Sequence, residues 1–130
     1  MPERPLSPYL SVYKFKYTLV TSILNRLAGL VLSLGFVLLA YWLVALAGGA
    51  RTYAQARALL ALGIFKIVYA LMLAAFAYHL IAGLRHLIWD TGRGLDRRSS
   101  RRSAWWVAAL SIIATLALAY LLLRPGAYAQ

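Results

Sequence analysis

Three long apolar runs, separated by short polar segments, dominate the pattern of this chain. A helix rises about 1.5 Å per residue, so about 20 apolar residues are needed to cross a hydrocarbon core of about 30 Å. The three runs cover residues 27–47, 58–84 and 104–123 and meet this requirement. We therefore predict an all-α membrane protein with three transmembrane helices in a single membrane domain, 1–130.

The polar segments predict how these helices are connected. Prolines at positions 2, 5 and 8 favour an extended N-terminal segment, and a helix is expected to begin near Thr18, within the lead 1–26. Gly48 and Gly49 are expected to end the first helix. The second helix is expected to continue to about residue 89, followed by a loop over 90–103.

Composition supports the membrane assignment and restricts the chemistry. Hydrophobic residues make up 63% of the chain and its mean hydropathy is +0.73, which excludes an ordinary water-soluble domain. There is no cysteine, so disulfides, thiolate metal sites and protein-bound iron–sulfur clusters are excluded within this chain. Any redox chemistry requires another type of ligand.

Basic residues are unevenly distributed between the two sides that the spans define. Cytoplasmic loops of membrane proteins are enriched in Lys and Arg, so we predict that the N-terminus and the second connection are cytoplasmic and the C-terminus is outside. The net charge of +11 does not indicate nucleic-acid binding, because topology and anionic lipid headgroups explain it, with docking of a soluble subunit as the alternative. The basic residues on the predicted cytoplasmic side are Arg4, Lys14, Lys16, Arg26, Arg85, Arg93, Arg97, Arg98, Arg101 and Arg102.

His79 is the strongest candidate for a functional residue because it lies in an otherwise apolar run. Ionisable side chains at membrane depth usually serve a function. On a helix, Gly83, His86 and Asp90 fall within about 40° of His79. His79 can bind a haem iron, with Gly83 leaving room for the macrocycle, or it can form an interhelical hydrogen bond.

His86 cannot share an iron with His79. Seven residues place it about 10.5 Å further along the helix, whereas two axial ligands approach one iron from opposite sides at about 2 Å each. His86 and Arg85 are candidates for contacts with haem propionates, His86 can instead pair with Asp90, and charged helix ends are also ordinary membrane anchors.

Ser22 and Arg26 are candidates for a second polar site at the start of the first helix. They are four residues apart and share a face, with Asn25 beside them. A hydroxyl and a guanidinium there can hydrogen-bond a quinone carbonyl or a propionate, although Arg26 can also bind a lipid phosphate. Lys66 has no assigned role.

Three motifs in register carry a family resemblance. They are RPLSPYLSVYK at 4–14, SILNRLAG at 22–29 and HLIAGLRHLIWD at 79–90. Together they resemble the cytochrome b anchor subunits of succinate dehydrogenase, respiratory complex II. The resemblance covers most of the chain.

The resemblance implies one haem b shared with a second hydrophobic anchor subunit, with His79 as this chain's axial ligand. It also implies that Ser22 and Arg26 line a ubiquinone site at the junction with an iron–sulfur subunit, which receives electrons from a flavoprotein subunit that oxidises succinate. The position of Asn25 is often His in the family and lies near a haem propionate. Asn25 can donate a hydrogen bond there but carries no charge. The implied location is the bacterial inner membrane.

Two alternatives remain at this point. The chain can be a haem-free structural anchor in which His79 only forms a hydrogen bond, or the anchor of a quinol:fumarate reductase that runs the reaction in reverse. A small transporter is disfavoured because the charged residues cluster at one end of the spans and do not line a path across the bilayer.

Overall fold

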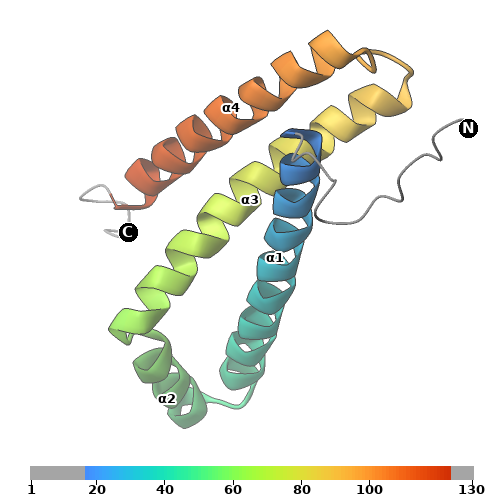
Figure 1. The fold of residues 1–130 in the computed structure, drawn as a ribbon. Helices are drawn as coiled ribbons and strands as arrows, with labels where there is room; N and C mark the ends of the chain where they lie inside the picture. Colours follow the sequence, from blue (N-terminus) through green and yellow to red (C-terminus); the bar gives the residue numbers. More distant parts are fainter. Residues whose placement is uncertain (1–16, 124–130) are drawn as a thin grey trace, which may run out of the picture.

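The computed structural model describes residues 17–123, which form four helices (Figure 1). These are α1 (Tyr17–Ala47), α2 (Ala50–Leu60), α3 (Gly63–Asp90) and α4 (Arg97–Leu123). The helices α1, α3 and α4 are long and apolar enough to cross a membrane. The prediction of an all-α membrane protein with three transmembrane helices is confirmed, whereas the predicted extended N-terminal segment lies outside the described residues.

The central helix of the bundle is α3, which packs against both α1 and α4. Figure 1 shows α1 leading to the short α2 at one end of the molecule, from which α3 returns alongside α1. At the opposite end a short connection leads from α3 into α4. We call this second end the basic end, because it includes Arg85 and the arginines between 93 and 102.

Small residues form the contacts between the helices, and large apolar side chains point outward. Val44 and Leu116 are 72% and 65% exposed, as expected for side chains that face lipid. Small residues allow helix backbones to approach closely where hydrophobic burial provides no driving force. Gly35 of α1 illustrates this, because the end of the Met72 side chain of α3 occupies the place of its missing Cβ. The buried alanines are Ala28, Ala45, Ala56, Ala75, Ala77, Ala82 and Ala104.

The helix α2 was not expected from the apolar pattern. The second span is predicted over 58–84, but the helix that carries it begins at Gly63 and ends at Asp90. The segment before it contains Arg51, Gln55 and Arg57, which are costly to insert into hydrocarbon, and it folds as a separate helix. The chain then turns at Leu62, whose extended ψ of 146° separates α2 from α3.

The second connection is also shorter than expected. A loop over 90–103 is predicted, but α4 already begins at Arg97. Asp96 precedes the helix and its carboxylate accepts a hydrogen bond of 2.9 Å from the backbone N–H of Ser99, which is the usual N-cap contact. Hydrogen bonds from Ser99, chiefly that of its backbone N–H, hold the pKa of the Asp96 carboxyl below its ordinary value. This cap extends α4 beyond its apolar run.

Gly49 sets the turn between α1 and α2, and the predicted end of the first helix at Gly48-Gly49 agrees with the observed end at Ala47. Gly49 has φ 93° and ψ −179°, a conformation that essentially only glycine adopts. The Thr52 hydroxyl lies 2.9 Å from the carbonyl oxygens of both Ala45 and Gly49 and can donate to a carbonyl at the C-terminal end of α1.

Gly49→Ala is expected to destabilise the protein by about 1–3 kcal/mol, the usual cost of this backbone conformation for a residue with a Cβ. Gly63→Ala is the matched control, because a Cβ at either position meets no atom within 4 Å and only Gly49 has a positive φ. Thermal unfolding of the purified protein in detergent measures the difference. Equal melting temperatures for the two variants would contradict this account of the turn.

Candidate functional site

His79 links α3 to α1 through a hydrogen bond to the backbone. Its Nδ1 lies 3.2 Å from the carbonyl oxygen of Asn25, and the side chain is half-buried. A carbonyl oxygen can only accept, so this contact requires the proton on Nδ1. The neutral imidazole then carries its free lone pair on Nε2, the arrangement by which a metal-binding histidine is usually oriented.

The close approach of α1 to His79 depends on Gly29. A Cβ at Gly29 would lie 3.3 Å from Cε1 of His79 and 3.7 Å from Nδ1, so a larger residue would press on the ring. Gly29 ends one of the three motifs, but the sequence alone assigned it no role. Its position four residues after Asn25, one helical turn along α1, is the signal that indicates a close approach.

Gly83 lies one turn beyond His79 on α3 and borders open space. A Cβ built on Gly83 meets no atom within 4 Å. This chain therefore does not itself require glycine at that position. The opening beside His79 leaves space along the backbone, and the packing of a haem there stays a prediction.

The Asn25 side chain has an unsatisfied polar atom. Its Oδ1 is buried and has no hydrogen-bond partner within the described part of the chain. Such an atom normally finds a partner, so the position is suited to a group that the chain alone does not supply. An anionic propionate requires a donor, and the Asn25 amide offers its Nδ2 when the amide is turned by 180°.

A lone imidazole is a suitable protein ligand for a haem. Across residues 17–123, no group of three or more His, Cys, Asp or Glu side chains could hold a metal ion. A haem brings its own equatorial donors and needs only axial ligands from protein. The donor set and the open space at Gly83 therefore fit this cofactor.

A pocket of about 340 Å³ lies at the basic end, between α1, α3 and the start of α4. It is lined by three of the predicted site residues, Ser22, Arg85 and His86. The Tyr78 hydroxyl, which was not expected to take part, donates to the Thr21 carbonyl at 3.2 Å and joins the two sides of the pocket. The complete lining is Thr21, Ser22, Tyr78, Ala82, Arg85, His86, Trp89, Leu95 and Ser100.

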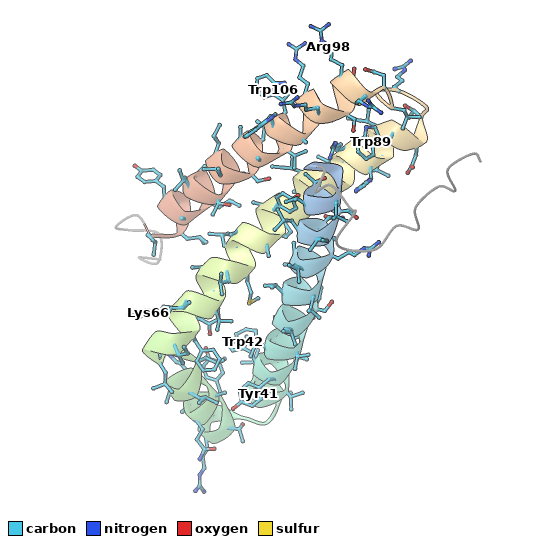
Figure 2. All side chains as sticks on the ribbon, in the orientation of Figure 1. Tyr41, Trp42, Lys66, Trp89, Arg98 and Trp106 are labelled. Carbon is cyan, nitrogen blue, oxygen red and sulfur yellow. The ribbon has the colours of Figure 1, made fainter. Side chains whose placement is uncertain are left out.

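Arg85 has a structural role that sequence alone did not indicate. Its guanidinium is buried and donates from Nε to the Ser103 hydroxyl at 2.9 Å and from Nη2 to the Ser100 carbonyl at 2.8 Å. It also lies 3.9 Å from the centre of the Trp89 ring, a cation–π distance. The two hydrogen bonds fasten α3 to α4, and the contact within α3 holds the guanidinium beside Trp89, which is labelled in Figure 2. A propionate contact for Arg85 stays a prediction.

The remaining candidates are exposed. His86 lies edge-on to Trp89, with ring centroids 5.2 Å apart. Arg26 is exposed on α1 one turn beyond Ser22 and is not among the residues that line the pocket. Lys66 lies in the first turn of α3, towards the opposite end of the bundle from the pocket (Figure 2). The structure thus forms a His79–Asn25 contact and a separate pocket around Ser22.

Comparison with known proteins identifies similar chains. The family model for the succinate dehydrogenase/fumarate reductase transmembrane subunit matches residues 1–118. The succinate dehydrogenase cytochrome b556 subunit of Paracoccus denitrificans is 37% identical over 111 residues, 85% of each chain. That of Rickettsia felis is 36% identical over 116 residues, 89% of this chain and 90% of the relative. The mitochondrial cytochrome b560 subunit of Homo sapiens is 32% identical over 124 residues, 90% of this chain and 70% of the relative.

Arg85→Leu is expected to lower the free energy of unfolding by about 1–3 kcal/mol, because the Ser100 carbonyl and the Ser103 hydroxyl each lose a charged donor between the two helices. Arg98→Leu, at an exposed position of α4, removes the same charge without this loss and serves as the control. Thermal unfolding in detergent compares the two. If Arg98→Leu proves equally destabilising, the interhelical role of Arg85 is wrong.

Proposed function

The chain belongs to the succinate dehydrogenase/fumarate reductase transmembrane subunit family, and from that premise we propose that it is the haem b-binding anchor of a bacterial succinate dehydrogenase. In this role it holds a flavoprotein subunit and an iron–sulfur subunit at the inner membrane and helps to form the site of ubiquinone reduction. This chain alone does not oxidise succinate. The observation that carries the proposal is the His79–Asn25 contact, which leaves Nε2 available to an iron.

His79 is proposed as this chain's axial ligand to one haem b. The Nδ1–H bond to the Asn25 carbonyl fixes the tautomer and the plane of the ring, and such an outer partner also raises the basicity of the ligating nitrogen. Gly83 leaves the adjoining backbone accessible to the macrocycle. The names of the relatives as cytochrome b subunits support the assignment of the cofactor. The bound haem supplies a one-electron redox centre within the membrane.

The second axial ligand is proposed to come from a second hydrophobic anchor subunit. The other histidine of this chain, His86, is seven residues from His79 and about 10.5 Å away along α3, too far to reach the same iron. His86 lies closer to the basic end than His79 does, and Asn25 lies beside His79 on α1. Both are proposed to contact the propionates. Neutral hydrogen-bond donors suffice for such contacts, although a charged donor would bind more strongly.

Ser22 and Arg26 are proposed to hold ubiquinone. Ser22 lines the pocket at the basic end, and Arg26 lies one turn further along the same face of α1. The hydroxyl and the guanidinium can each donate a hydrogen bond to a quinone carbonyl oxygen, and both favour the negative charge that develops there on reduction. The pocket opens at the basic end, where the positive-inside rule places the cytoplasm and the soluble subunits dock.

The two alternatives are separated by different observations. The family name includes fumarate reductases, but the relatives from Paracoccus denitrificans and Rickettsia felis are named as subunits of succinate dehydrogenase, which favours succinate oxidation as the direction. A haem-free anchor would also explain the His79 hydrogen bond. It would not explain the open space at Gly83 or the lack of a hydrogen-bond partner for the buried Asn25 Oδ1.

His79→Ala is expected to abolish or shift the b-type signal in the reduced-minus-oxidised visible spectrum of the purified complex, because the iron loses an axial ligand. Lys66→Ala, in the first turn of the same helix and without a proposed role, is the control and should leave the spectrum unchanged. An unchanged spectrum in His79→Ala would place the ligand elsewhere. The absence of any signal from the wild-type complex would favour the haem-free anchor.

Arg26→Ala is expected to lower the rate of ubiquinone reduction about ten- to a hundredfold, as for loss of a charged hydrogen-bond donor at a reacting oxygen. Succinate oxidation by an artificial soluble dye should be preserved, because it bypasses the quinone pocket. Arg51→Ala, in α2 at the other end of the bundle, is the control. Equal loss of both activities in Arg26→Ala would contradict the assignment of this residue to the quinone site.

A further inference from the structure

A continuous groove runs along α4 on the side that faces α1 and α3. It consists of two adjoining cavities of about 380 Å³ and 390 Å³, which share Leu24, Tyr78 and Ala108 in their linings. The first cavity extends to Arg101 and Trp105 at the basic end, and the second extends to Ile112 and Leu116. Because the shared residues lie between these ends, the two cavities form one elongated groove, which we call the α4 groove.

The walls of the α4 groove offer an apolar surface. The hydroxyl groups along it are already used within the chain: Ser111 donates to the Val107 carbonyl at 2.6 Å, and Thr115 donates to the Ser111 carbonyl at 2.7 Å. The Tyr78 hydroxyl is likewise bonded to the Thr21 carbonyl. An occupant of the second cavity therefore gains contact area and needs no hydrogen-bonding groups.

The length of the groove matches one leaflet of a membrane. Trp105 and Leu116 are eleven residues apart, which corresponds to about 16 Å along a helix. Half of a hydrocarbon core of about 30 Å is about 15 Å. Trp105 is 71% exposed and occupies the end of the groove where interfacial tryptophans usually lie. An acyl chain that starts at the level of Trp105 would end near Leu116.

The mouth of the groove carries positive charge. Arg101 lines the mouth of the groove. Arg98, Arg101 and Arg102 are all exposed and project from α4 within about 100° of one another. Figure 2 shows Arg98 extending away from the bundle at this end. Guanidinium groups bind phosphate oxygens through charge-assisted hydrogen bonds. The mouth is thus complementary to an anionic headgroup directly above the apolar groove.

The α4 groove faces a different direction from the proposed haem site. Ala74, which lines the groove, precedes His79 by five residues and therefore lies about 140° away around α3. The groove adjoins the Ser22 pocket only through Thr21 and Tyr78, which line both. Its occupant is separate from the haem and from the quinone.

We propose that the α4 groove binds one anionic phospholipid, with an acyl chain along Leu24, Ala108 and Leu116 and the phosphate at Arg101. The charge at the mouth distinguishes this occupant from a transmembrane helix of a partner subunit, which needs no anion at the interface. In Figure 1, α4 and α1 run apart from the basic end. The bound lipid fills the space between them and so supports the bundle on this side.

The test is to measure the phospholipid that stays bound to the intact complex after detergent purification. Arg101→Gln removes the headgroup contact, and Ala108→Phe fills the shared centre of the groove. Arg93→Gln, in the connection before α4 and outside the lining of the groove, and the exposed Ala109→Phe are matched controls. Each complex is incubated with phosphatidylglycerol, and the lipids that it retains are counted by native mass spectrometry. Each groove variant should retain one lipid fewer than the wild type, and the controls should retain the same number. The visible spectrum verifies that each complex is assembled.

Retention of all lipids by Arg101→Gln would overturn the headgroup assignment, whatever the result for Ala108→Phe. A photoreactive benzoylphenylalanine at position 108 identifies the occupant without relying on stability. A phospholipid adduct is expected. An adduct with another polypeptide would show that a partner helix fills the groove and would overturn the proposal.

Discussion

The contact between the His79 imidazole and the Asn25 carbonyl is the interaction on which the rest of this structure depends. It joins α3 to α1 in the apolar part of the bundle, and it requires the proton on Nδ1, so the second ring nitrogen keeps its lone pair free. Gly29 favours the contact, because a Cβ at this position would press on the His79 ring. The hydrogen bond that packs two membrane helices would thus also orient the proposed metal ligand, and the structural and cofactor interpretations of His79 are compatible.

The same stretch of α1 connects His79 to the proposed quinone pocket. Ser22 precedes Asn25 by three residues, about 4.5 Å along the helix, so one turn of α1 carries both the pocket hydroxyl and the carbonyl that orients His79. The far wall of the pocket depends on Arg85, whose buried guanidinium holds α4 against α3. Two polar contacts therefore position three apolar helices, as expected where burial of apolar surface cannot drive association.

Hydropathy was sufficient to predict the three spans, because a membrane requires long apolar helices whatever their packing. It was also sufficient to single out His79, since an ionisable group in an apolar run is costly. The separate helix α2, the partners of Arg85 and the role of Gly29 could not be predicted in this way. They depend on where one helix meets another, and the acceptor for His79 is a backbone carbonyl that every residue possesses. The family resemblance supplied roles for Ser22 and Arg26 that neither periodicity nor charge could assign.

The most direct test of the central claim is an experimental structure of the assembled complex at a resolution that defines the plane of the His79 ring. We predict that Nε2 of His79 binds a haem iron directly, with Nδ1 still against the Asn25 carbonyl. An iron bound by other residues, or a His79 ring whose Nε2 faces lipid or a partner side chain, would contradict the account.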